Sequence, residues 1–302
     1  ERPLGFAAHM DQIEPCRNVN PVINGNIIST DKTTTLGGDD KAGISAIMEA
    51  VEDIIESGVP HRDIYLVFTC SEEISMMGTK HMDMSMLPCK ELVVVDATGG
   101  AETLAYKAPA MEAIEITFKG KKAHAGIEPE KGINAIVVAS KAISKMHIGR
   151  IDYETTSNIG HIEGGSATNI VTDEVTFTAE IRSHSMEKLA AEVTHMEQCC
   201  KEAVEEMGAC YEMKHEMAYP VLSLEEDCEL IQDTVNAMAE ERITANKMII
   251  GGGSDANVLA GHGYKSVILG CGMINVHTVE EALDTDETWK VTKVLRRLMG
   301  AE

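Results

Sequence analysis

The sequence has few aromatic side chains, few basic ones and no long apolar run. Only 4% of its 302 residues are aromatic, whereas it contains 18 Met, which we expect to fill gaps in the core. Lys and Arg number 26 against 49 Asp and Glu, which gives a net charge of −23. A chain this acidic is not expected to bind nucleic acid or an anionic membrane non-specifically.

Two further absences concern membranes and disulfide bonds. No apolar run approaches the roughly 20 residues that a transmembrane helix needs, and the first residues show no signal-peptide pattern. The eight cysteines form no C-x-x-C pair, and Cys199 and Cys200 are adjacent, a spacing that rarely allows a disulfide. These features favour reduced thiols in a cytoplasmic protein.

Short apolar runs alternate with helical patterns in the first third of the chain. The runs at 4–11, 63–70 and 91–97 predict strands, and the last two are continuously apolar, as in strands buried on both faces of a parallel sheet. The spacing of apolar residues predicts a helix over 39–58 that ends at Gly58. This alternation predicts an α/β core.

The middle of the chain has a different pattern. Residues 111–120 and 174–183 alternate apolar and polar side chains, as half-exposed antiparallel strands do, and helical patterns occupy 132–146 and 186–207. After Pro220 the α/β pattern returns. The elements expected there are a helix at 224–240, a strand at 247–250, a loop at 251–257, a strand at 265–270 and a helix from about 279. We therefore predict an α/β domain made of residues 1–108 and 218–302, with an α+β domain inserted at 109–217.

Polar side chains gather where the predicted α/β strands end. They are His9 and Asp11, Glu72 and Glu73, Asp96, Asp39 and Asp40 at the start of the first helix, and His277 after the strand at 265–270. Ligands of open α/β sheets bind at the carboxyl ends of the strands. Histidine and carboxylate together suit divalent cations such as zinc, or cobalt or manganese. Five protein ligands are too many for one catalytic zinc, so the pattern predicts two metals that share a bridging carboxylate. A second His-x-Asp sequence at 81–83 is not expected to take part.

The adjacent acids Glu72 and Glu73 have a chemical reason to be neighbours. One of them can bind a metal while the other takes the proton from the metal-bound water, and bound cations offset their mutual repulsion.

The motifs in the chain resemble those of the dinuclear-zinc exopeptidases of metallopeptidase family twenty. The resemblance covers "AHMD", "LGGDDKAGI", "SEEI", "VVDA", "KGKKAHAGIEPEKGINAI", "IEGGSATNIV", "AEIRSH", "GGGSDAN" and "NVHTVEE", in that order. The "DDKAG", "AHAG" and "HT" elements are most similar to the peptidase T (tripeptidase) branch. A related aminopeptidase family also has "AHMD" and "DD", but "GKKAHAG" and "GGSATNIV" belong to the lid of family twenty. The resemblance implies a three-layer α/β/α catalytic domain with an inserted α+β lid or dimerisation domain.

The resemblance also implies a ligand set for two metals, with zinc expected and cobalt or manganese possible. His9 and Asp96 match the ligands of one metal, and Glu73 and His277 match those of the other. Asp39 rather than Asp40 matches the bridging carboxylate, because the family pattern there is Asp-x-Lys.

Further residues match catalytic positions of the family. Asp11 matches the acid that orients His9, and Glu72 matches the general base. His124, in the inserted domain, matches a histidine that stabilises the developing oxyanion and is often supplied by a neighbouring subunit.

Substrate-binding residues are implied in the same way. Asn169 and Arg182 match groups that hold the substrate, Arg182 by gripping a carboxylate. The glycine run that includes Gly252 and Gly253 is not followed by Lys-Ser/Thr, so we interpret it as a tight turn that lines the substrate pocket rather than as a phosphate loop.

Some features depart from the family pattern. Gln12 stands where Thr is usual, and Ser75 stands where Gly usually follows "SEEI". The chain begins shortly before His9, whereas relatives carry a further segment upstream, so we expect either a fragment or a short branch.

The resemblance implies a metal-dependent exopeptidase that cleaves short peptides, with tripeptides cut from their N-terminus as the first expectation. A metal-bridging water activated by Glu72 would attack the peptide carbonyl. Two alternatives remain open: an amidase that removes acyl groups from amino acids, and a non-catalytic paralogue that binds metal or ligand. A homodimer through the inserted domain is expected.

Overall fold

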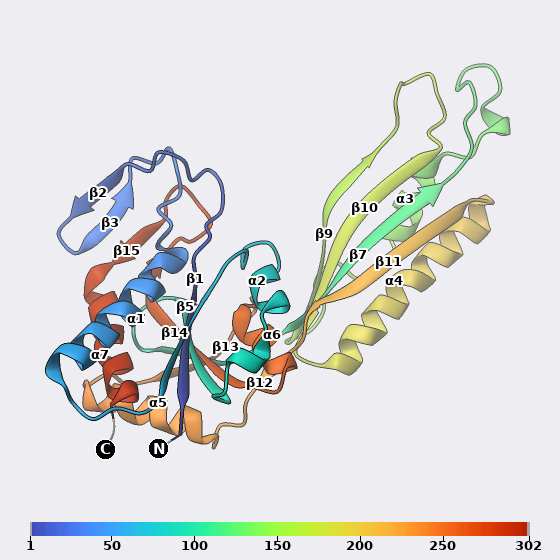
Figure 1. Cartoon of the computed structure of the whole chain (residues 1–302). Helices are drawn as coiled ribbons and strands as arrows, with labels where there is room; N and C mark the ends of the chain where they lie inside the picture. The colour runs from blue at the N-terminus through green and yellow to red at the C-terminus, as the bar shows by residue number, and fades with distance from the viewer. Residues whose placement is uncertain (1, 301–302) are drawn as a thin grey trace. The chain divides into compact units, whose positions relative to one another are not determined.

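The computed structural model describes residues 2–300, which form two compact units (Figure 1). The α/β unit contains the chain up to Ala108 and from Leu222 onward, and the inserted unit is Pro109–Val221. The inserted unit extends past the predicted boundary at residue 217 because its last strand, β11, runs over Cys210–Tyr219.

The α/β unit is built on a ten-stranded mixed sheet whose centre is parallel. The order β4-β1-β5-β14 is parallel throughout, with shorter strands beyond β14. The central strands are β1 Leu4–His9, β4 Ile64–Thr69, β5 Glu91–Thr98 and β14 Lys265–Ile274. The flanking strands are β2 Pro21–Asn24, β3 Ile27–Thr30, β6 Thr103–Ala108, β12 Leu222–Ser223, β13 Asn246–Ile249 and β15 Ala282–Asp284. The central strands and β13 confirm the predicted runs. The other flanking strands were not predicted.

Helices cover both faces of this sheet and complete the predicted three layers. The larger core joins one sheet face to α1 (Gly38–Ser57), α5 (Glu229–Glu240) and α7 (Thr285–Met299). The other face packs against α6 (Asp255–Gly261), next to α2 (Met77–His81) and the 3-10 turn Met84–Met86.

The ends of the helices follow local chemistry. Helix α1 ends at Gly58 as predicted, because this glycine adopts φ +61° and its N–H bonds the Ile54 carbonyl at 3.1 Å. Helix α7 begins at Thr285, later than predicted, because β15 precedes it and Asp284 caps it. The predicted loop at 251–257 is shorter than expected because Ser254 caps α6.

The inserted unit is a five-stranded antiparallel sheet with two helices on one face. The strand order is β11-β7-β10-β9-β8. Besides β11, its elements are β7 Ala110–Lys119, the 3-10 turn Pro129–Lys131, α3 Ala135–Ile143, β8 Gly149–Arg150, β9 Thr155–Gly164, β10 Glu174–Ser183 and α4 Met186–Met207. Phe118 and Phe177 pack at 6.1 Å between ring centroids in the core beneath the helices. The predicted α+β composition is confirmed.

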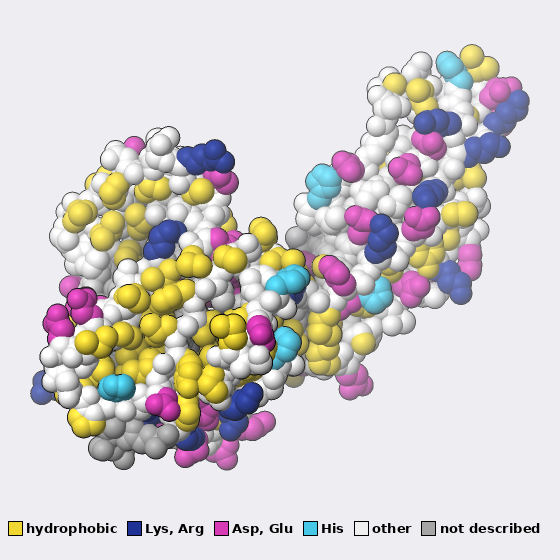
Figure 2. Space-filling view, in the orientation of Figure 1, with side chains coloured by type: hydrophobic (Ala, Val, Ile, Leu, Met, Phe, Trp, Pro, Cys, Tyr) yellow, Lys and Arg dark blue, Asp and Glu magenta, His cyan; other side chains and the backbone are white. Residues whose placement is uncertain are grey.

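Apolar side chains gather on the face of the α/β unit that Figure 2 shows. Ile55 on α1 is 73% exposed, Leu66 on β4 is 40% exposed, and Ile74 is 65% exposed. Strand β4 is also the last strand at its side of the sheet, so its outer edge has no strand partner among residues 2–300. Over the same residues, no helix is long and apolar enough to cross a membrane. All eight cysteines are free thiols.

Candidate metal centre

Three parallel strands bring the predicted polar residues to one edge of the sheet. His9 is the last residue of β1 and pairs with Thr69, the last residue of β4, after which come Glu72 and Glu73. Asp96 lies near the end of β5, the neighbour of β1 on its other side. In-register pairing of parallel strands therefore turns residues far apart in sequence into neighbours in space.

Asp39 lies between the two histidines and joins two groups of side chains. Its Oδ1 is 2.9 Å from His9 Nε2, and its Oδ2 is 3.3 Å from His277 Nε2. On the first side, His9 Nε2 is also 3.6 Å from Asp96 Oδ1. On the second, His277 Nε2 is 2.9 Å from Glu73 Oε2. The structure thus brings together all five residues predicted as metal ligands, with the predicted bridging carboxylate in the middle.

The donor atoms of this cluster fit a metal centre. Ligand atoms of His9, Asp39 and Glu73 all lie within 4.8 Å of one another, and so do those of His9, Asp40 and Asp96. Two buried atoms in the cluster, His9 Nδ1 and Glu73 Oε1, have no hydrogen-bond partner among residues 2–300. Buried polar atoms are normally paired, and imidazole with carboxylate is the donor set that zinc and related cations prefer.

The electrostatics of the cluster favour the binding of cations. Burial, followed by the Asp96 carboxylate, raises the pKa of Glu72 to about 9. Burial, followed by Asp39, raises the pKa of Glu73 to about 7. Burial alone would lower the pKa of His9, but its hydrogen bonds to Asp39 and Asp96 raise that pKa to about 12. The protein alone therefore holds protons where bound cations would neutralise the carboxylates.

Asp11 fixes the turn that carries the two glutamates. Its Oδ1 accepts a hydrogen bond from the Glu72 N–H at 3.0 Å, and its Oδ2 accepts one from the Glu73 N–H at 3.1 Å. Asp11 Oδ1 is also 3.5 Å from His9 Nδ1. In this turn Ser75, which replaces the usual Gly, adopts φ +69°, a left-handed conformation that a non-glycine residue adopts at a cost.

Three buried acids around the centre were not predicted to act there. Asp40 accepts hydrogen bonds from the N–H groups of His9 and Gly43. Glu281 accepts from the N–H groups of Leu36, Gly37 and Asp39, and Asp255 accepts from Thr69 Oγ1 and Thr79 Oγ1. All three lie in the family motifs "GGDDKAG", "NVHTVEE" and "GGGSDAN". The motifs could have pointed to these three acids. A motif alone does not show whether an acid binds a metal or only holds a metal ligand in position.

Gly43 provides a first test of this packing. A Cβ at this position would lie 2.2 Å from the Val95 carbonyl oxygen and 2.5 Å from Asp40 Oδ1. We expect Gly43→Ala to lower the free energy of unfolding by about 1–3 kcal/mol, although alanine by itself favours a helix. Urea denaturation measures the effect. Gly251→Ala is the control, since nothing lies within 4 Å of its Cβ position. Equal midpoints for both variants would contradict the prediction.

The predicted residues of the inserted unit fall into two separate places. His124 and Ile170 form a backbone bridge, and the Ala125 N–H donates to the Asn169 carbonyl at 2.9 Å, so His124 and Asn169 are neighbours. Arg182 lies near the opposite end of β10, where it forms an ion pair with Glu180 at 2.9 Å. Arg182 is eight residues beyond the first residue of β10, which is the end of the strand near His124. At about 3.4 Å a residue, this places Arg182 roughly 25 Å from that end.

Gly252 and Gly253 lie in the loop between β13 and α6. The position of a Cβ on Gly252 has nothing within 4 Å, so no close packing requires glycine there. Their substrate-binding role stays a prediction.

Comparison with known proteins places this geometry in a family. The model of a peptidase dimerisation domain, M20_dimer, matches residues 111–208, and the model of the M42 glutamyl aminopeptidases matches residues 10–121. The aminopeptidase PepT of Bacillus cereus ATCC 10987 is 36% identical, with a TM-score of 0.91 over 99% of this chain and 80% of that chain. The chain belongs to the M20 metallopeptidase family.

Two further relatives are similar to this chain over nearly its whole length. A tripeptidase of Staphylococcus aureus subsp. aureus Mu50 is 35% identical, with a TM-score of 0.95 over 99% of this chain and 80% of that chain. The protein YqjE of Bacillus subtilis (strain 168) is 41% identical over 96% of this chain and 78% of its own length. The M42 match is confined to residues 10–121, where "DD" is a motif that both families share, whereas the inserted unit matches the M20 model over residues 111–208.

Proposed function

We propose that this M20 family member is a metal-dependent aminopeptidase that cleaves tripeptides. The observation that carries the proposal is Asp39, whose two oxygens face His9 on one side and His277 on the other, with Glu72 buried next to the cluster. Similarity over nearly the whole chain to proteins described as an aminopeptidase and a tripeptidase supports the substrate class. The amidase alternative has no comparable support.

Two divalent cations fit the two groups of side chains. His9, Asp96 and Asp39 would hold one, while Asp39, Glu73 and His277 would hold the other. We propose zinc, with cobalt or manganese as substitutes, because imidazole and carboxylate ligands suit all three. The free cysteines are consistent with a cytoplasmic enzyme.

The chain's own residues have distinct tasks in the reaction. Bound cations supply Lewis acidity and make a water acidic enough to lose a proton. Glu72, which is buried next to these side chains, would accept that proton and pass it to the leaving amine. Asp11 holds the Glu72 backbone in place.

Three residues of the inserted unit are also given roles in this proposal. We propose that His124 donates a hydrogen bond to the developing oxyanion, and that Asn169 and Arg182 hold the peptide. His124 and Arg182 lie at opposite ends of their sheet, so they would serve different parts of the reaction. The match to a peptidase dimerisation domain supports a homodimer through this unit.

A substrate panel tests the proposal. Metal-loaded protein is offered Leu-Gly-Gly, Gly-Leu and N-acetyl-methionine with zinc, cobalt or manganese, and the released amines are measured. We expect release of leucine from Leu-Gly-Gly at a kcat/KM well above those for the other two, because tripeptidase-like similarity spans both units. Cleavage of N-acetyl-methionine alone would replace the proposal with an amidase. If the protein binds two metals but cleaves none of the three substrates, the alternative of a non-catalytic paralogue would be favoured.

A further inference from the structure

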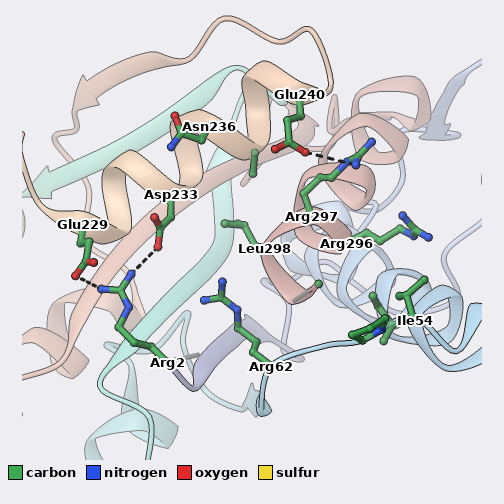
Figure 3. Close-up of a pocket in the computed structure, with 14 residues that line it drawn as sticks. Arg2, Ile54, Arg62, Glu229, Asp233, Asn236, Glu240, Arg296, Arg297 and Leu298 are labelled. Carbon is green, nitrogen blue, oxygen red and sulfur yellow. Dashed lines mark hydrogen bonds and ion pairs between the residues drawn. The ribbon is translucent and has the colours of Figure 1, made fainter. Parts of the chain in front are cut away.

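A pocket near the amino ends of the central strands of the α/β unit is lined by four arginines (Figure 3). It is separate from the metal centre, which lies at the carboxyl ends of these strands. Its volume is about 690 Å³, within the range that small-molecule sites occupy. Arg2 lies two residues before the start of β1, and Arg62 lies two residues before the start of β4, so both are at the amino ends of strands whose carboxyl ends lead to the metal centre. Six residues of β1 at about 3.3 Å each put roughly 20 Å between the pocket and His9.

Three of the four arginines are neutralised by carboxylates of the protein. The pairs are Arg2 with Glu91, Glu229 and Asp233, Arg296 with Asp53, and Arg297 with Glu240 and Glu241. Figure 3 shows the pairs of Arg2 and Arg297 along helix α5 and its neighbour α7.

Arg62 is the exception. No carboxylate of residues 2–300 forms an ion pair with it, and its Nε is buried without a hydrogen-bond partner in that part of the chain. Figure 3 shows its guanidinium directed into the middle of the pocket, with no dashed contact. A guanidinium is always charged, and a buried donor without a partner costs about 1–3 kcal/mol. In a chain with a net charge of −23, a carboxylate partner would have been easy to supply.

The rigid walls of the pocket suit a bound anion. Arg62 is held by its backbone, since its N–H donates to the Met299 carbonyl at 3.1 Å and its carbonyl contacts His61 Nδ1 at 2.8 Å. The opposite wall is α5, which contributes the exposed Asn236 to the lining of the pocket.

We propose that this pocket binds a small anion whose carboxylate or phosphate oxygens accept hydrogen bonds from Arg62. A planar guanidinium presents two parallel donors to either group. The site goes beyond the proposed peptidase activity, because none of its residues belongs to the metal centre.

Titration calorimetry on the metal-loaded protein tests this proposal, with inorganic phosphate and butyrate as the two probes. The variants are Arg62→Gln, Asn236→Glu and, as the matched control, Arg150→Gln, which removes an exposed arginine of the inserted unit. Asn236→Glu places a negative charge in the pocket at an exposed helix position and leaves Arg62 in place. It therefore keeps the test valid if Arg62→Gln fails to fold.

We expect the wild type and Arg150→Gln to bind at least one probe equally well. Arg62→Gln and Asn236→Glu should each bind it about tenfold or more weakly, the factor expected for a lost charge-assisted hydrogen bond. Binding of phosphate alone would identify phosphorylated ligands, and binding of butyrate alone would identify carboxylates. The proposal is overturned if the wild type binds neither probe, or if both pocket variants bind as the wild type does. The second result would assign any phosphate binding to the metal centre.

Discussion

Glu72→Gln is expected to abolish tripeptide hydrolysis while the protein stays folded and keeps its metals. The glutamine has nearly the shape of the glutamate but cannot accept a proton, and general-base catalysis contributes roughly 10²–10⁴-fold. Burial, followed by the Asp96 carboxylate, disfavours a charge on Glu72 and raises its pKa to about 9, so a neutral amide is no more costly to bury there than the carboxyl group it replaces. We therefore expect stability equal to or above that of the wild type, with kcat reduced at least 100-fold.

Metal content, thermal unfolding and kcat measured on the same preparation separate these effects. The control is Glu56→Gln, an exposed glutamate on α1, which should behave as the wild type. A Glu72→Gln enzyme with normal kcat would show that another group accepts the proton. Loss of metal in this variant would show instead that Glu72 is a ligand.

Removal of the metals is expected to lower the thermal stability of the α/β unit as well as its activity. Ligands that bind only the folded state at about 1,000 times their Kd add about 4 kcal/mol, and a destabilisation of this size lowers Tm by roughly 10 °C. The melting temperature with and without a chelator gives this difference. Equal melting temperatures would contradict the assignment of the cluster as a metal centre.

The pH dependence of the metal-free form has a definite sign. The pKa of Glu72 rises to about 9, that of Glu73 to about 7 and that of Asp96 to about 6, in each case with burial as the largest cause. Because these carboxyls hold protons in the folded state that they lose on unfolding, the stability of the metal-free form falls as pH rises from about 4.5 to 9.

His9 acts in the same direction. Its raised pKa of about 12 gives a stabilisation that is complete below about pH 6.5 and is lost as pH rises toward 12. The chelated protein should therefore melt at a lower temperature at pH 8.5 than at pH 6, and the metal-loaded protein should show a smaller difference. A larger difference in the metal-loaded form would contradict this reasoning.

Much of the fold was predictable because helices and strands that bury one face repeat apolar residues at a regular spacing in the sequence. The strand at 174–183 and the helix at 186–207 have the predicted bounds in the structure, since each alternates or repeats apolar residues over its whole length. The short strands β2, β12 and β15 were missed because two to four residues are too few to show a period. Pairing with neighbours, rather than local preference, makes them strands.

The candidate site was predictable to the level of residue types at strand ends. His9, Glu73 and Asp96 lie at or near the ends of runs predicted to be strands of an α/β core, and family motifs supplied the roles of Asp39 and His277. The supporting acids Glu281 and Asp255 were missed, because their partners are backbone N–H groups and hydroxyls distant in sequence. No spacing along the chain encodes such contacts.

The sequence by itself determined the α/β core, the inserted α+β unit and the chemistry of the metal centre, because periodicity and motif order are local properties of the chain. Only the tertiary structure decided that the two oxygens of Asp39 face different histidines, and that His124 and Arg182 lie at opposite ends of one sheet. It alone decided that Arg62 is without a carboxylate partner in the described chain, whereas Arg2 beside it has three. Pairing between charges depends on distances of a few ångströms between elements, and those distances exist only after packing has fixed the elements against one another.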